Sequence, residues 1–185
     1  MPELAATLYR ATLGAELDRL APALVRFHGD PAGGRARGRL RVVRGRGLAR
    51  LAGWVIGAPA AGDAVPVDMR VEVLAAGERP RERWVRSFAG APMVTRQWRT
   101  AGALVEALGP SALEFELVRE GAAMRYVQTG ARLLGIPLPR WLSPRVRALA
   151  GPCEGRDDAW TIEVDIAAPV LGTIVGYSGI MELEP

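Results

Sequence analysis

Alternation of apolar and polar residues runs through most of the chain and predicts β-strands. The pattern is clearest over residues 67–73, where apolar Val67, Met69 and Val71 alternate with charged residues. A period of two places successive side chains on opposite faces of a sheet. Similar runs, separated by turns rich in Gly and Pro, are predicted after Gly121 and at residues 35–43, 83–88, 93–99, 103–108, 113–117, 145–150, 162–166 and 173–183.

A helical period is found mainly near the N-terminus. The apolar spacing predicts a helix over residues 2–13, and after Gly14 the same spacing continues to Phe27. A further short helix is predicted over residues 48–56, where Gly57 ends it. Helices therefore account for a small part of the chain, and the sheet is expected to dominate.

Short turns between strands favour an antiparallel sheet, because parallel strands need long crossover connections. A sheet of about 8–10 strands tends to curl or close on itself. We therefore expect an α+β fold, with a strongly bent antiparallel sheet or open β-barrel, an N-terminal helix and short helical insertions. Residues 1–185 are expected to form a single domain, in which a helical segment over 1–30 packs on a mainly antiparallel β region over 35–185. Two Gly-x-Pro insertions, at 57–59 and 135–137, are expected to cover the sheet.

Composition argues for a cytoplasmic protein. No segment reaches the roughly 18 unbroken apolar residues of a membrane span, since Pro and Gly interrupt the nearest candidate at 166–181. The N-terminal residues include acidic Glu3 and lack the apolar core of a secretion signal. The single cysteine, Cys153, cannot form an internal disulfide and suits a reducing compartment.

Positive and negative charges are concentrated in different segments. Residues 26–50 hold eight arginines and one aspartate, whereas residues 152–185 hold seven acidic residues and one arginine. Such asymmetry can mark a surface for nucleic acid or lipid headgroups. It can equally mark neighbouring strands that neutralise each other, for instance if the first strand pairs with the last but one. All 24 Lys and Arg positions hold arginine, which is typical of a GC-rich bacterial coding bias and weakens arguments from any single arginine.

Catalytic motifs are incomplete. The turn at Gly45–Gly47 lacks the third glycine of a dinucleotide-binding loop, and a Gly-Tyr-Ser-Gly run at 176–179 lacks the last glycine of a nucleophile elbow. The one histidine, His28, follows a helical pattern at a loop and is expected to be solvated. One His and one Cys do not supply the usual zinc ligands. We assign no catalytic residue, metal site or cofactor, and the sequence favours a non-enzymatic protein while leaving catalysis open.

Aromatic and amide side chains within the predicted strands are the candidates for a ligand site. A bent sheet lined by aromatic rings and a few amides is suited to an apolar ligand, whereas the alternative is a filled core in which each amide is hydrogen-bonded. Aromatic rings beside arginines can also stack on bases, but a high pI is weak evidence and nucleic acid is not favoured. The ligand-binding candidates are Trp84, Arg96, Gln97, Trp98, Tyr126, Gln128, Trp141 and Tyr177.

Several short motifs resemble those of a bacterial family of domains of unknown function. They are Leu8-Tyr9-Arg10, Leu13-Gly14, Arg35-Ala36-Arg37-Gly38, Thr95-Arg96-Gln97, Leu108-Gly109-Pro110 and Arg132-Leu133-Leu134-Gly135-Ile136-Pro137-Leu138-Pro139. This chain has Ala131 where the family often has an aromatic residue. The resemblance spans nearly the whole chain and implies no catalytic residue. It implies that members stand alone or are fused to saccharopine-dehydrogenase-like NAD-binding domains, which suggests an NAD-binding oxidoreductase as a partner.

Two functions follow from these patterns. The first is a binding or accessory domain with an apolar pocket for a small hydrophobic or lipid-like ligand, which predicts a cavity behind Trp84, Trp98, Tyr126 and Tyr177. The alternative is a module that docks protein or nucleic acid on one face of the first strand. That alternative predicts a filled core and an unpaired stripe formed by Arg35, Arg37, Arg39 and Arg41.

Overall fold

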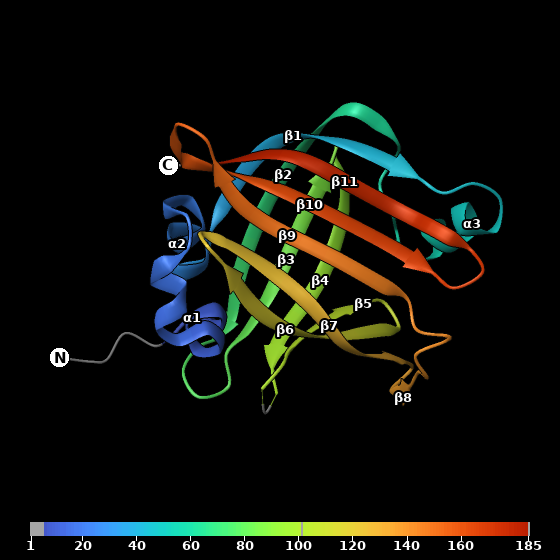
Figure 1. Cartoon of the computed structure of the whole chain (residues 1–185), viewed down its shortest axis with the longest axis horizontal. Helices are drawn as coiled ribbons and strands as arrows, with labels where there is room; N and C mark the ends of the chain where they lie inside the picture. The colour runs from blue at the N-terminus through green and yellow to red at the C-terminus, as the bar shows by residue number, and fades with distance from the viewer. Residues whose placement is uncertain (1–5, 101, 185) are drawn as a thin grey trace.

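A computed structural model describes residues 6–100 and 102–184 of the chain. The chain begins with helical segments α1 (Leu8–Leu13), the 3-10 helix η1 (Gly14–Arg19) and α2 (Pro22–Gly29), and α3 (Leu48–Val55) follows the first strand (Figure 1). Helix α1 begins at Leu8, where the Thr7 side chain caps it by accepting from the Arg10 amide, so Ala6 and Thr7 of the predicted helix are not helical. Residues 2–5 of that prediction lie outside the described residues.

Within the described residues, eleven strands form one antiparallel sheet, which closes because β6 pairs with β7. Ten strands make up the closed barrel, and the two-residue β8 is attached to β7. The predicted antiparallel fold is confirmed, and the sheet closes into a barrel. The strands are β1 (Arg35–Arg44), β2 (Gly62–Ala75), β3 (Arg81–Phe88), β4 (Ala91–Arg99), β5 (Leu104–Leu108), β6 (Ser111–Glu120), β7 (Ala123–Leu133), β8 (Ile136–Pro137), β9 (Arg145–Cys153), β10 (Arg156–Ala168) and β11 (Gly172–Leu183).

The first strand pairs with the last one rather than with the last but one. In the β1–β11 ladder Arg37 lies opposite Glu182, and in the β1–β2 ladder it lies opposite Asp68. The acidic residues of β10 are one strand further away, because β11 separates β10 from β1. The arginine-rich strand therefore has acidic neighbours, but they are not the ones that the sequence pattern suggested.

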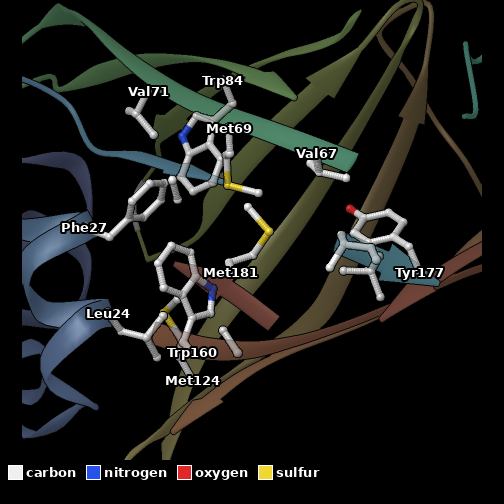
Figure 2. Close-up of a cluster of buried hydrophobic side chains, with 14 of the residues drawn as sticks. Leu24, Phe27, Val67, Met69, Val71, Trp84, Met124, Trp160, Tyr177 and Met181 are labelled. Carbon is white, nitrogen blue, oxygen red and sulfur yellow. The ribbon is translucent and has the colours of Figure 1, made fainter. Parts of the chain in front are cut away.

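The helical segments before β1 close one end of the barrel (Figure 1). The backbone amide of Ala21 donates to the carbonyl of Ala122 in the β6–β7 turn, at 2.9 Å. The backbone amide of Leu8, at the start of α1, donates to the buried carboxylate of Glu82 on β3, at 3.3 Å. Phe27 of α2 packs between Trp84 and Trp160, with ring centroids 5.6 and 4.9 Å away (Figure 2). We call these segments the plug.

The opposite end of the barrel carries α3, the connection from β7 to β9 and the β10–β11 turn (Figure 1). Both predicted Gly-x-Pro insertions belong to this end. Gly57 follows α3 with φ +69°, and Gly135 sits in the β7–β8 turn with φ +81°, conformations that favour glycine. The insertions therefore lie around one opening of the barrel and not over its outer face.

Among the helices of residues 6–100 and 102–184, none is long and apolar enough to cross a membrane.

Candidate ligand-binding site

A cavity of about 400 Å³ occupies the interior of the barrel. Its floor is formed at the plug by Phe27, His28 and Trp160, and its outer part reaches Ile56 and Leu171 at the opposite end. Met, Val, Ile, Leu and Ala side chains form most of the wall between them. The volume is within the range of small-molecule sites, and such sites are mostly apolar with few polar groups. The cavity thus has the size and chemistry of a site for a small apolar molecule.

The inward faces of the strands supply this wall through simple alternation. On β3 the side chains of Trp84, Arg86 and Phe88 are buried, and the residues between them are more exposed. Figure 2 shows Trp84, Met69 and Met181 pointing into the barrel beside Phe27 of the plug. Arg86 is thus carried into the interior by the same period of two that buries its aromatic neighbours.

One ion pair lies in the cavity wall. Arg86 on β3 donates through Nη1 to Thr95 Oγ1 at 2.9 Å and through Nη2 to Glu106 Oε1 at 3.1 Å. Burial alone would lower the pKa of Arg86, but the carboxylate of Glu106 opposes this and the net shift is upward. The guanidinium also lies 4.9 Å from the centre of the Trp84 ring. The cavity therefore contains a paired, charged group with fixed orientation in an otherwise apolar wall.

Two tyrosines and a glutamine link the plug to the barrel wall. The hydroxyl of Tyr9 in α1 donates to Gln97 Oε1 at 2.9 Å and lies 2.8 Å from the hydroxyl of Tyr126 on β7. Because Tyr9 has one proton and gives it to Gln97, the hydroxyl of Tyr126 must donate to Tyr9. Burial raises the pKa of both phenols, so both stay protonated at neutral pH. The chain of hydrogen bonds holds α1 against two strands.

His28 is buried at the end of α2, which contradicts the expectation of a solvated loop histidine. Its ring lies 3.9 Å from the ring of Tyr9, and burial lowers its pKa to about 3. The apolar spacing predicted that this helix ends at Phe27, but α2 continues for two more residues, to Gly29. His28 is therefore a helical residue, and its imidazole faces inward. Its Nδ1 is buried with no hydrogen-bond partner among the described protein atoms. His28 is therefore a neutral side chain in the cavity floor.

Gln128 spans a gap in the barrel wall. The β7–β9 ladder covers only four residue pairs, from Met124 to Val127 on β7. Beyond it, Gln128 Nε2 donates to the Pro144 carbonyl, and the Val146 amide donates to Gln128 Oε1, both at 2.8 Å. A groove of about 710 Å³ along this seam shares six lining residues with the inner cavity, among them Tyr126 and Ala148. The Gln128 side chain thus replaces backbone hydrogen bonds where β7 and β9 separate.

Residues 20–181 match the model of a family described as a domain of unknown function (DUF4166). The chain belongs to this family. The resemblance inferred from its motifs is thereby confirmed. No curated protein matches this DUF4166 domain. Among solved structures it is similar to a crystal structure of a protein assigned as a thioesterase II from Thermobifida fusca YX, with 8% identity and a TM-score of 0.24 over 96% of this chain and 84% of that one.

The eight ligand-binding candidates fall into different environments in the DUF4166 barrel. Trp84, Tyr126 and Tyr177 line the cavity. Gln97 is buried and bonded to Tyr9, whereas Arg96 is exposed on the outer face of β4. The other three lie away from the cavity: Trp98 is on the outer face of β4, Gln128 is in the seam between β7 and β9, and Trp141 is exposed at the end opposite the plug.

The four docking candidates on β1 of this DUF4166 domain all lie on its outer face. Arg35, Arg37, Arg39 and Arg41 are exposed, and the residues between them are buried or partly buried. Arg41 lies 3.6 Å from Asp63 in an exposed ion pair, which contributes about 0–1 kcal/mol to stability. The stripe therefore exists as the alternation predicted, on a wall that also encloses a cavity.

Sequence reasoning missed Glu106 and Glu82, both of which point inward from their strands. Glu106 shares a face with Leu104 and Leu108, so strict alternation along β5 would have placed it inside. Glu82 precedes Trp84 by two residues and accepts from its indole Nε1 at 3.0 Å. Burial raises the pKa of Glu82, although the hydrogen bonds from Trp84 and Leu8 oppose this. Within the described residues, no group of three or more His, Cys, Asp or Glu side chains is placed to hold a metal ion.

Proposed function

We propose that this DUF4166 domain binds a small hydrophobic or lipid-like ligand inside its barrel and acts as a non-enzymatic binding or accessory domain. The observation that carries the proposal is the apolar cavity of about 400 Å³, which extends from the plug to the α3 end. A packed protein interior has few voids larger than a water molecule. A space of this size therefore has a cost in stability that occupation by an apolar ligand would offset.

The Arg86–Glu106 pair selects the polar part of the ligand. The pair carries no net charge, and each partner already satisfies the other at 3.1 Å. An uncharged hydroxyl, ester or ketone can accept from a remaining N–H of Arg86 and leave the pair intact. A ligand carboxylate would have to compete with Glu106 for the same guanidinium, and this would leave a buried carboxylate unpaired. We therefore expect a mainly apolar ligand with an uncharged polar group.

Native mass spectrometry of the purified domain, beside a denatured sample, is the first test. The expected result is a reproducible extra mass that disappears on denaturation, and extraction of that material identifies its class. A purified apo protein is expected to bind N-phenyl-1-naphthylamine, an uncharged apolar dye whose fluorescence rises in an apolar site. A clean apo mass together with no saturable dye binding would refute the proposal.

A cavity-filling variant locates the binding. Ala148 lines the cavity from β9, between Tyr126 and Val164 in the two ladders. Ala148→Phe is expected to weaken dye binding by roughly tenfold or more, because the larger side chain occupies the ligand's space. Ala107→Phe is the matched control, since Ala107 follows cavity-lining Glu106 on β5 and faces outward opposite exposed Arg96. Equal loss in both variants would show that the dye does not bind in the cavity.

A further inference from the structure

Large apolar side chains are exposed around the end of the barrel opposite the plug. They come from α3, from the β7–β9 connection and from the β10–β11 turn, which also contribute cavity-lining residues such as Ile56, Leu138 and Leu171. Figure 1 shows α3, β8 and the β10–β11 turn on the same side of the molecule. We call this set the rim, and it comprises Leu48, Leu51, Trp54, Val55, Leu134, Ile136, Trp141, Leu142 and Val170.

Helix α3 shows the reverse of an ordinary surface helix. Its small residues Ala49 and Gly53 are buried, whereas Leu51 and Trp54 point to solvent. Trp54 and Trp141 come from two different segments of the rim and are 75% and 74% exposed. Apolar side chains gathered in this way mark an interaction site rather than the scattered exposure of a usual surface.

The rim segments carry positive charge and no negative charge. Residues 44–61 and 132–145 hold six arginines and no acidic residue, and residues 166–172 hold no charge. Arg132 is paired with Glu114 on β6 at 2.9 Å. Among the described residues, none of the other five lies within ion-pair distance of a carboxylate; they are Arg44, Arg46, Arg50, Arg140 and Arg145.

We infer that the rim docks on the surface of an anionic phospholipid bilayer. Exposed Trp and Leu side chains beside arginines suit the boundary between acyl chains and anionic headgroups. The cavity reaches Ile56, Leu138 and Leu171 in these segments, so docking would bring this end of the cavity to the lipid phase that holds apolar ligands. This inference rests on the proposed function, because it assigns the bilayer as the source or destination of the ligand.

Charge favours a bilayer over a second copy of the chain. A symmetric dimer through the rim would place the same patch of both copies face to face. The unpaired arginines of the two copies would then repel each other, and none of the three rim segments holds a carboxylate that could offset this. An anionic bilayer supplies the opposite charge over a large area and accepts the apolar side chains at the same time.

Vesicle co-sedimentation tests the inference. The domain is expected to sediment with vesicles of phosphatidylcholine and phosphatidylglycerol, and much less with phosphatidylcholine alone or at high salt. Arg46→Glu with Arg140→Glu is expected to weaken partitioning by about tenfold or more, since each basic residue near such a surface contributes on the order of a fivefold factor. Arg79→Glu with Arg99→Glu, two exposed arginines near the plug, is the charge-matched control and is expected to retain most of the binding.

The apolar part of the contact has its own pair of variants. Trp54→Ser with Trp141→Ser is expected to lose about tenfold in partitioning, because it removes the aromatic anchors. Leu74→Ser with Ile180→Ser removes two exposed apolar side chains outside the rim and is expected to have little effect. All four variants alter exposed side chains, and unchanged melting temperatures would confirm that they fold.

The outcomes separate the docking from the proposed ligand site. Rim variants are expected to keep solution binding of N-phenyl-1-naphthylamine, whereas Ala148→Phe is expected to keep vesicle binding and lose the dye. Absence of vesicle binding, equal binding to neutral and anionic vesicles, or a concentration-dependent dimer that the Trp variants abolish would overturn the inference. Vesicle binding without any dye binding would support docking and contradict the proposed function alone.

Discussion

The guanidinium of Arg86 on β3 lies 3.1 Å from the carboxylate of Glu106 on β5, and Thr95 on the strand between them accepts a second hydrogen bond. Three neighbouring strands thus contribute one polar group each to the same point in an apolar wall. Both charges are largely removed from water, with side-chain exposures of 9% and 18%. Neither charge can be removed alone without leaving the other unpaired in a medium that solvates it poorly.

Arg86→Met is therefore expected to destabilise the domain by about 3–5 kcal/mol, because it leaves the carboxylate of Glu106 without its partner. The double variant Arg86→Met with Glu106→Leu is expected to recover most of this loss, since both charges are then replaced by apolar groups of similar size. Urea denaturation of the two variants beside the parent measures both values. Additive losses in the double variant would show that the pair is not coupled.

The single histidine provides a direct pH test. A folded-state pKa of about 3 for His28, against 6.5 in the unfolded chain, means that the unfolded state binds the extra proton first as pH falls. Stability is therefore fully present above pH 6.5 and is lost below it, by roughly 1.4 kcal/mol per pH unit down to about 3.

NMR of the imidazole in the native protein is expected to show no titration between pH 5 and 8. His28→Gln should remove the histidine part of the acid destabilisation, measured as the difference between the two proteins across this pH range. A native titration midpoint near 6.5 would contradict the buried, neutral state.

Tyr9→Phe tests the link between the plug and the wall. The change deprives Gln97 Oε1 of its donor and the Tyr126 hydroxyl of its acceptor, and it is expected to cost about 1–3 kcal/mol. Tyr177→Phe is the matched control, because Tyr177 also lines the cavity but its hydroxyl is not part of the Tyr9–Gln97–Tyr126 hydrogen-bond chain. Its expected cost is about 0.5 kcal/mol. Similar losses in the two variants would argue against a role for the hydrogen bonds.

Gln128→Ala is expected to open the seam between β7 and β9. It removes the side-chain hydrogen bonds to Pro144 and Val146 that span the gap, at an expected cost of about 1–3 kcal/mol. Amide hydrogen exchange should accelerate at Val146 and leave the centre of the β10–β11 ladder unchanged. Thr129→Ala, at the next and exposed position, is the control. Unaltered exchange at Val146 would mean that the seam is held by other contacts.

Local pattern predicted the strands and the helix at residues 48–56, since alternation and Gly turns depend on near neighbours in the chain. Alternation also suffices to place Trp84, Arg86 and Phe88 on one face of β3, where all three are buried. The pairing of β1 with β11 was beyond such reasoning, because it joins segments more than 130 residues apart. The buried state of His28 was missed for a similar reason, since two of the rings packed against it, those of Tyr9 and Trp84, belong to other elements.

Whether the barrel holds a cavity depends on the volumes of the inward-facing side chains and not on the alternation of apolar and polar residues. Alternation shows that Tyr126 and Tyr177 point inward, but it does not show whether the side chains facing them fill the space. On β4 Gln97 is buried, whereas its neighbours Arg96 and Trp98 lie on the opposite face. Alternation alone could therefore have removed these two from the candidates for an interior site. The exposed apolar residues of α3 gave a signal in sequence as well, since four of its five exposed positions hold Leu, Trp or Val and Arg50 is the fifth.

Closure of the sheet has a consequence for how the protein behaves at high concentration. Each of the ten long strands in the described part of the chain has a neighbour on both sides. Open sheets present a row of free amides and carbonyls that can template the addition of a foreign strand, and this is a common start of aggregation. The pairing of β6 with β7 gives both end strands of the sheet a partner. Crowding is therefore not expected to drive self-association by adding a strand to a free sheet edge.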